Sequence, residues 1–210
     1  MRVRLSYSEL ELIRFTGHLD LQRVWERTFR RSKLPVAYSK GFHPQARIQI
    51  ACALPLGFTS LCELLDFWLD GAIPLAEIEK ALTKAIPPGI RIDQFEEVDP
   101  SQPPLQTQVI ASDYMVTLLD PIISQDLELR VNNLLSNSSL IRIRREKQYD
   151  LRPLVEDLVG HSKPDQRSQI FMRLSARENA TARPEEVLSA LGFDPFAARI
   201  ERTHLILKSV

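Results

Sequence analysis

Hydrophobic and polar residues along the first hundred positions switch between two spacings. Residues 2–7 alternate with a period of two, which predicts a half-buried strand. The next apolar residues recur at helical spacing and predict an amphipathic helix that Pro35 ends. Further along, the patterns predict strands at 47–53, 61–69 and 90–98 and a helix at 74–86. The apolar stripe of the first helix consists of Leu21, Val24, Trp25, Thr28 and Phe29.

A similar succession recurs in the second half of the chain. Residues 100–107 include three prolines and predict a linker. Beyond the linker, the patterns predict helices at 121–135 and 184–191 and a short helical insert at 154–159. Strands are predicted at 108–119, 139–147, 168–176 and 198–208.

Apart from the insert, each half has the order strand, helix, strand, strand, helix, strand, which is typical of a ferredoxin-like fold. We therefore expect an α+β protein made of two tandem ferredoxin-like (βαββαβ) domains with antiparallel sheets. The predicted boundaries are 1–99 for the first domain, 100–107 for the linker and 108–210 for the second domain.

Composition excludes several classes of protein. The chain has 210 residues, of which 44% are hydrophobic, so it is not disordered. Two cysteines are too few for a disulfide framework or, alone, for a four-ligand zinc site. Because no apolar run is long enough to span a membrane and residues 1–10 lack the core of a signal peptide, we expect a cytoplasmic protein that does not bind membranes.

The formal net charge of zero conceals a strong asymmetry along the chain. Residues 1–50 carry ten basic and four acidic side chains, residues 51–130 carry four and thirteen, and residues 131–210 carry thirteen and ten. An excess of positive charge at one end indicates a surface for an anionic partner or an internal interface between basic and acidic faces. The structural alternative is a solvated face with no partner.

The first predicted helix carries four arginines on the side opposite its apolar stripe, and His18 and Asp20 lie at its start. Guanidinium groups suit phosphate oxygens, whereas the structural alternative is a solvated helix face. A histidine near a carboxylate suits acid–base chemistry, whereas the structural alternative is a helix cap in which a backbone carbonyl satisfies His18. The four arginines are Arg23, Arg27, Arg30 and Arg31.

The loop that follows the helix collects several groups that contact nucleic acids. Its glycine permits close approach of a ligand to the backbone, its aromatic rings suit stacking, and its polar groups suit a phosphate or an unpaired base. The structural alternative is a loop in which Phe42 fills the edge of a core. The candidate residues are Tyr38, Ser39, Lys40, Gly41, Phe42, His43 and Arg47.

A second polar group of residues lies in the C-terminal half. Arg142 and Arg144 share one face of the strand predicted at 139–147, with Arg145 beside them, and would form a basic stripe on the second sheet. Asp150 and Arg152 follow. The structural alternative is that Asp150 forms an ion pair with Arg152 or Arg145 and holds the insert in place.

Motifs for a cofactor or a metal are missing. The sequence contains no Walker A motif, no GxGxxG and no CxxxCxxC, and Cys52, Cys62, His18 and His43 lack the spacing of a metal site. We therefore expect neither a bound cofactor nor a metal.

Three blocks of sequence resemble the radical SAM-linked protein family, an uncharacterised domain fused to, or encoded beside, a radical SAM protein with a cobalamin-binding-like region. The first block includes His18-Leu19-Asp20-Leu21, Arg30-Arg31, Leu34-Pro35, Ala37-Tyr38-Ser39, Gly41-Phe42, Pro44, Leu54-Pro55-Leu56-Gly57, Ser60, Glu63 and Leu65-Asp66. The others are Tyr149-Asp150-Leu151-Arg152-Pro153-Leu154-Val155 and Arg183-Pro184-Glu185-Glu186-Val187-Leu188, with Arg202-Thr203 near the end.

The resemblance implies a radical SAM protein as partner and RNA or the translation machinery as substrate, but it implies no activity of the chain itself. We therefore expect a binding module that presents RNA to that enzyme. One alternative is a metal-independent RNA-processing or RNA-modifying enzyme that uses His18 or His43 with Tyr38 or Lys40. Tandem ferredoxin-like halves occur in CRISPR-repeat endoribonucleases and, more distantly, in tRNA pseudouridine synthases. Another alternative is a protein-interaction subunit that docks its partner through the acidic segment 63–128.

Overall fold

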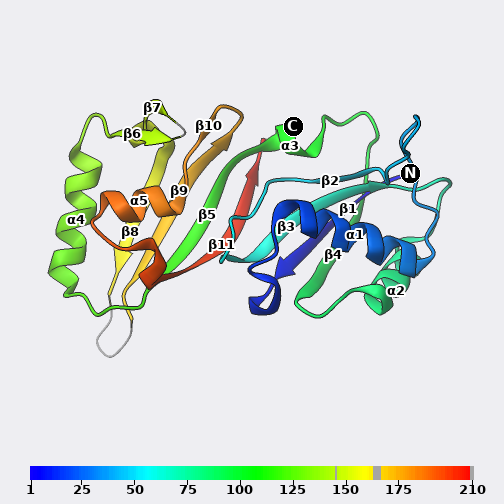
Figure 1. Cartoon of the computed structure of the whole chain (residues 1–210), viewed down its shortest axis with the longest axis horizontal. Helices are drawn as coiled ribbons and strands as arrows, with labels where there is room; N and C mark the ends of the chain where they lie inside the picture. The colour runs from blue at the N-terminus through cyan, green and yellow to red at the C-terminus, as the bar shows by residue number, and fades with distance from the viewer. Residues whose placement is uncertain (145, 163–166, 209–210) are drawn as a thin grey trace. The chain divides into compact units, whose positions relative to one another are not determined.

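The computed structural model describes residues 1–144, 146–162 and 167–208, and the chain forms two compact units, Met1–Gln108 and Val109–Val210 (Figure 1). Each unit combines helices with a mostly antiparallel sheet, so the predicted α+β class is confirmed. No helix of the described residues has the length and apolar character of a membrane span.

The first unit contains a four-stranded sheet in the order β4-β1-β3-β2, in which all neighbouring strands are antiparallel. Figure 1 shows helix α1 in front of this sheet. The strands are β1 (Arg2–Glu9), β2 (Ile48–Ile50), β3 (Thr59–Trp68) and β4 (Ile90–Val98). The helices are α1 (His18–Ser32), α2 (Leu75–Ala85), α3 (Leu105–Gln108) and the 3-10 turn η1 (Glu11–Ile13).

Aromatic rings join α1 to the sheet of the first unit. The fully buried ring of Trp25 meets Tyr7 edge-on at 4.9 Å between centroids. One turn further along α1, Phe29 lies 4.7 Å from Phe67 of β3. These contacts belong to an apolar cluster that anchors α1 and α2 on the sheet, so the predicted stripe is the buried face of the helix.

On the opposite side of β1, Arg2 and Arg4 form a buried hydrogen-bond network with Asp66. Arg2 donates from Nε and Nη2 to Oδ2 of Asp66 at 3.0 and 2.6 Å. Arg4 donates from Nε to Oδ1 of the same carboxylate at 2.8 Å and from Nη2 to Oδ2 at 3.1 Å. All three side chains are buried, so Asp66 balances two arginines at the centre of the sheet.

The proline-rich segment 100–107, predicted as a linker, packs as part of the first unit. Arg2 donates from Nη1 to the carbonyl of Gln102 at 2.7 Å and from Nη2 to that of Pro103 at 3.0 Å. Leu105 is fully buried. Prolines cannot donate a backbone hydrogen bond, but their carbonyls can accept one, and this is how the segment is held.

The second unit has a sheet in the order β8-β9-β5-β11, with neighbouring strands antiparallel and β10 paired to β9. Its sheet strands are β5 (Val109–Leu118), β8 (Val155–His161), β9 (Gln169–Arg177), β10 (Ala180–Thr181) and β11 (Ala198–Leu207). A separate hairpin consists of β6 (Ile141–Arg144) and β7 (Lys147–Asp150). The helices are α4 (Ser124–Ser136), α5 (Pro184–Ala190), and the 3-10 turns η2 (Arg152–Leu154) and η3 (Pro195–Ala197).

Two predicted elements of the second unit are wrong. Of residues 154–159, predicted as helical, only Leu154 lies in the 3-10 turn η2, and the others belong to β8, whose Val155 and Leu158 are buried. The segment 139–147, predicted as a strand of the main sheet, lies in the separate β6–β7 hairpin. The basic stripe of Arg142 and Arg144 is therefore on this hairpin and not on the second sheet, while Arg145 lies outside the described residues.

Two glycines in the first unit have the same backbone angle but different surroundings. Gly89 and Gly71 both have φ +94°, yet a Cβ on Gly89 would lie 2.6 Å from Cγ2 of Ile13 and one on Gly71 would meet nothing within 4 Å. We expect Gly71→Ala to lower the free energy of unfolding by about 1–2 kcal/mol, because an L side chain is strained at positive φ. Gly89→Ala should cost about 1–3 kcal/mol more, because it also overpacks. Urea titration of both variants measures the difference, and equal losses would contradict the predicted clash.

Candidate nucleic-acid interface

The loop between α1 and β2 is closed at its base by the backbone. Tyr38 and Ala46 form an antiparallel bridge, and the Ser39 N–H donates to the carbonyl of Gln45 at 2.8 Å. In return, the Gln45 N–H donates to Oγ of Ser39 at 3.0 Å. Gly41, at φ +148°, provides a backbone angle that L side chains rarely adopt. These contacts hold residues 40–44 as a short tip on a defined base.

The tip exposes its aromatic ring to solvent. The relative exposure of Phe42 is 102%, and that of Tyr38 at the base is 56%. The alternative in which Phe42 fills the edge of a core is therefore wrong. Lys40 and His43, the neighbours of Gly41 and Phe42, are exposed as well. The loop thus presents rings and cations together.

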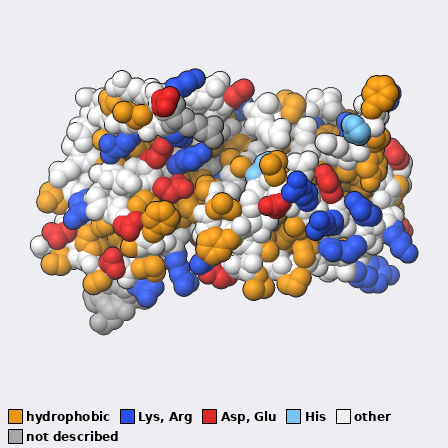
Figure 2. Space-filling view, viewed as in Figure 1, with side chains coloured by type: hydrophobic (Ala, Val, Ile, Leu, Met, Phe, Trp, Pro, Cys, Tyr) orange, Lys and Arg blue, Asp and Glu red, His pale blue; other side chains and the backbone are white. Residues whose placement is uncertain are grey.

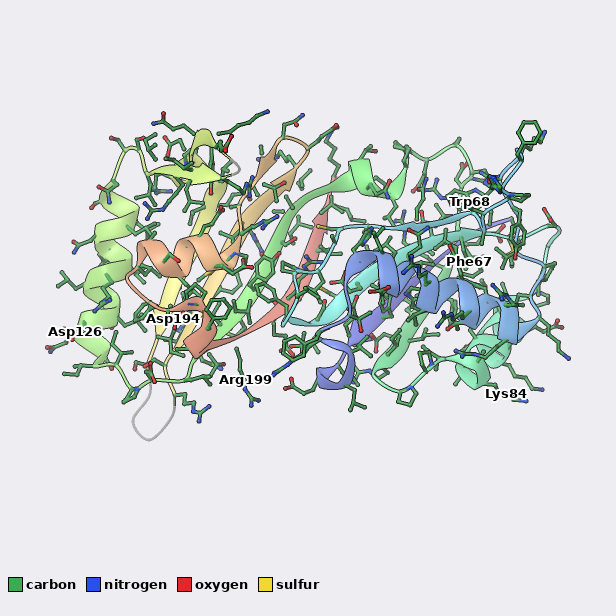
Figure 3. All side chains as sticks on the ribbon, viewed as in Figure 1. Phe67, Trp68, Lys84, Asp126, Asp194 and Arg199 are labelled. Carbon is green, nitrogen blue, oxygen red and sulfur yellow. The ribbon has the colours of Figure 1, made fainter. Side chains whose placement is uncertain are left out.

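Arg47 extends this surface from the other side of the loop. Its guanidinium carbon lies 4.7 Å from the centroid of the Trp68 ring, and that of Arg2 lies 5.2 Å from the same ring. The Ala37 N–H donates to the carbonyl of Trp68 at 2.8 Å, which joins the base of the loop to the end of β3 (Trp68 is labelled in Figure 3). Trp68 therefore positions Arg47, a role that the sequence pattern did not indicate.

The four arginines of α1 have different partners. Arg23 donates to Oδ1 of Asp20 at 2.9 Å in an exposed ion pair. Arg31 donates to the carbonyl of Ala85, at the C-terminal end of α2, from Nε at 3.1 Å and from Nη2 at 2.7 Å. Within the described residues, the side chains of Arg27 and Arg30 form neither a hydrogen bond nor an ion pair. Arg27 and Arg30 are therefore exposed cations of α1 that no contact within the described residues neutralises.

Basic side chains gather over α1 and α2 on the face of the first unit that Figure 2 shows. Lys84, which Figure 3 labels, is exposed on α2 next to Ala85, where Arg31 binds. Sequence reasoning missed Lys84, because only the contact between Arg31 and α2 joins it to the arginines of α1. The structure therefore combines the predicted helix face with a lysine from a second helix.

His18 does not belong to this part of the surface. Residues 18–32 form one helix, so His18 lies about 20 Å along α1 from the segment that enters the loop. Its Nδ1 is buried and has no hydrogen-bond partner among the described residues, so the predicted contact with a backbone carbonyl is not formed. Asp20 pairs with Arg23, and no side chain caps the helix at Gly17.

In the second unit, Arg144 has contacts within the fold. Its Nη2 donates to the carbonyl of Thr181 at 3.2 Å, and its Nη1 lies 3.7 Å from Oε2 of Glu186. The Tyr149 ring lies 5.0 Å from the Arg144 guanidinium carbon. Burial raises the pKa of the Tyr149 hydroxyl, and the neighbouring Glu186 carboxylate acts in the same direction. Arg142 is half-buried on the same strand. This cluster therefore holds the hairpin to α5.

Asp150 and Arg152 also use their polar atoms inside the second unit. The Asp150 carboxylate accepts from the Leu140 N–H at 2.7 Å and from the Arg152 N–H at 3.0 Å. The contact with Leu140 holds the pKa of Asp150 below its usual value. Arg152 donates to the carbonyls of Leu135 and Val155 at 3.1 Å each, so it caps the end of α4. These contacts fasten the hairpin on both sides.

A cavity of about 390 Å³ lies at the start of α4. Its walls include Asp126 and Arg130 of α4 and Phe193 and Asp194, of which Figure 3 labels Asp126 and Asp194. Arg130 donates to the Leu191 carbonyl at 2.9 Å and lies over the Phe193 ring. No motif in the sequence indicated this cavity.

The described residues contain no group of three His, Cys, Asp or Glu side chains placed to hold a metal ion.

The described residues form an α+β protein whose first unit exposes basic side chains on α1 and α2 and both aromatic and basic side chains on the loop before β2. Residues 2–184 match a family described as "Uncharacterized protein conserved in bacteria (DUF2344)". The chain therefore belongs to this family. No curated protein matches it.

A solved structure with a similar fold is the crystal structure of a Cbf5-Nop10-Gar1 complex. The TM-score is 0.51 at 8% sequence identity, and the match covers 95% of this chain and 48% of the other. The present chain therefore spans about half the length of that protein. At this identity the likeness concerns the fold alone.

Proposed function

We propose that the protein binds RNA through its first unit and serves as an accessory binding module of a radical SAM enzyme system. The interface is the basic–aromatic surface, which we define as Arg27, Arg30, Tyr38, Lys40, Phe42, His43, Arg47 and Lys84. The assignment of a radical SAM partner is supported by the three sequence blocks from His18 to Thr203 that resemble that family.

The observation that carries the proposal is that the first unit exposes both a fully solvated aromatic ring and cations that have no ionic partner among the described residues. Phe42 has 102% relative exposure, and Arg27 and Arg30 have no ionic partner among the described residues. Unpaired cations attract phosphates and release counterions, and exposed rings accept bases. A solvated helix face explains the arginines but not the ring.

We also infer that both units are ferredoxin-like. In the first unit the order β4-β1-β3-β2 with antiparallel neighbours is the one that a split βαβ arrangement produces. In the second unit β11-β5-β9-β8 follows the same scheme, with the β6–β7 hairpin inserted after α4. Because such sheets serve many functions, the RNA proposal rests on the surface and not on the fold.

Neither alternative function gains support from a contact. Among the described residues, no hydrogen bond joins His43 to Tyr38 or Lys40, so no observation favours cleavage of RNA by these groups. Docking through the acidic segment 63–128 loses several of its carboxylates, because Glu63, Asp66 and Asp113 are buried. Both alternatives stay predictions.

The proposal predicts that reversing two charges on α1 weakens RNA binding. Arg27→Glu/Arg30→Glu should lower the affinity for a fluorescein-labelled RNA hairpin at least tenfold in fluorescence anisotropy at low salt. The slope of log Kd against log salt should fall by about 1 for each phosphate that the variant no longer neutralises. Arg199→Glu is the matched control, because Arg199 is an exposed arginine of β11 (Figure 3). Its Kd should stay within twofold of the wild-type value.

Circular dichroism of the variants checks that the helices remain folded. Failure of the wild-type chain to bind RNA at low salt overturns the proposed function. Equal effects of the α1 variant and the Arg199 variant would show that binding is not at the basic–aromatic surface.

A further inference from the structure

We infer that the basic–aromatic surface selects unpaired nucleotides, with Phe42 and Tyr38 stacking on bases and the cations holding the adjoining phosphates. This inference rests on the proposed function and adds the class of RNA to it. The selected RNA contains a single-stranded segment, such as a tail, a bulge or a wide loop. This segment lies next to the RNA duplex whose phosphates α1 contacts.

The Phe42 ring is exposed to solvent at the tip of the loop. With 102% relative exposure, the ring makes no contribution to the core of the first unit. An aromatic ring in water gains free energy when a flat apolar partner covers it. The free face of a nucleobase is such a partner, and each base has one, so the contact tolerates different sequences.

Hydrogen bonds restrain the backbone at the base of the loop. The bridge between Tyr38 and Ala46 and the two hydrogen bonds between Ser39 and Gln45 fix the base of the loop. Only residues 40–44 extend beyond it. The backbone of so short a tip loses little conformational freedom on binding, which favours affinity.

The loop that carries the rings also carries basic side chains. Lys40 precedes Phe42 and His43 follows it in the sequence of the tip, and the Arg47 guanidinium lies over the Trp68 ring. A peptide that covers Phe42 has no need of cations at this spacing, whereas a polynucleotide places phosphates on both sides of each base. The arrangement therefore fits a nucleic acid strand better than an apolar protein groove.

The interior of an RNA duplex is not the preferred binding site of the loop tip. Bases in a double helix are already stacked on each other, so their faces are closed to a protein ring. Phosphates, in contrast, are exposed in both single and double strands. The arginines of α1 should therefore bind either form, and the tip should add affinity only where nucleotides are unpaired.

The experiment compares two RNAs with the same stem, one blunt and one with a 3′ tail of eight uridines, in fluorescence anisotropy. The wild-type chain should bind the tailed RNA more tightly. Phe42→Ala should weaken binding of the tailed RNA about tenfold, a typical effect of losing one stacked base, and should change binding of the blunt RNA less than twofold. Phe196→Ala is the matched control, because Phe196 is 93% exposed on η3 of the second unit.

Two further variants separate stacking from simple apolar contact. Phe42→Leu keeps an apolar side chain without a ring and should lose most of the preference for the tail. Phe42→Trp keeps a ring and should retain the preference. Full retention by the leucine variant overturns the inference of stacking.

The outcomes distinguish this inference from the proposed function on which it rests. If the wild-type chain binds both RNAs and Phe42→Ala has no effect, the selection of unpaired nucleotides is wrong and RNA binding stands. If the wild-type chain binds neither RNA, both are wrong. A loss of tail preference in Phe42→Ala, and not in Phe196→Ala, supports the inference.

Discussion

Replacing Asp66 by asparagine is expected to lower the free energy of unfolding by about 3–5 kcal/mol, because the buried Arg2 loses its carboxylate partner and the buried Arg4 keeps only the exposed Glu96, 3.8 Å away. Asp66 accepts four hydrogen bonds from Arg2 and Arg4 at 2.6–3.1 Å. An asparagine carries no charge and offers one acceptor oxygen instead of two. Its NH₂ group would also point a donor at one of the arginines.

The measurement for Asp66→Asn is urea unfolding followed by tryptophan fluorescence. Asp70→Asn is the control, because Asp70 is an exposed aspartate just beyond the end of β3. It should change the free energy of unfolding by about 0.5 kcal/mol or less. A loss below about 1 kcal/mol for Asp66→Asn would mean that water or other groups replace the carboxylate.

The second large effect is expected at Trp25, whose ring attaches α1 to the sheet. Trp25→Ala should cost about 3–5 kcal/mol, because it empties a fully buried site between Tyr7 and Phe29. Trp25→Phe should cost about 1–2 kcal/mol, since it removes part of the volume. The indole N–H of Trp25 has no hydrogen-bond partner among the described residues, so phenylalanine loses no such bond.

Thermal and urea unfolding of both Trp25 variants test this order, with Trp68 as the remaining fluorophore. The exposed Phe42→Ala variant is the control and should unfold within about 0.5 kcal/mol of the wild type. Equal costs for alanine and phenylalanine would show that ring packing does not hold α1. Below its unfolding transition, Trp25→Phe should bind RNA like the wild type, because its side chain faces the core.

Elements in which apolar residues recur at regular spacing over many residues were predictable from the sequence. Elements with only a short pattern were not. The stripe from Leu21 to Phe29 predicted α1, and the strand predicted at 90–98 has the bounds of β4. Residues 155, 158 and 159 have the spacing of a helix turn, which produced the wrong helical insert. In the structure the segment pairs with β9, and this long-range pairing outweighs the local pattern.

The candidate site was predictable only as a set of residue types. Arg31 and Arg27 lie on the same polar face of one predicted helix, yet Arg31 donates to the carbonyl of Ala85, which is distant along the chain. Periodicity contains no information on such contacts. The full exposure of Phe42 and the support of Arg47 by Trp68 likewise depend on how the loop meets β3.

The different partners of the arginines on α1 have a consequence for how this surface changes during evolution. Arg31 closes the carbonyl end of α2, so its replacement is penalised through folding. Arg27 and Arg30 contribute no such contact among the described residues, so their replacement should leave the fold intact. One helix thus combines an arginine that the fold requires with two that it does not require. Under the proposed function, substitutions at positions 27 and 30 would change the strength of phosphate binding without compensating mutations in the core.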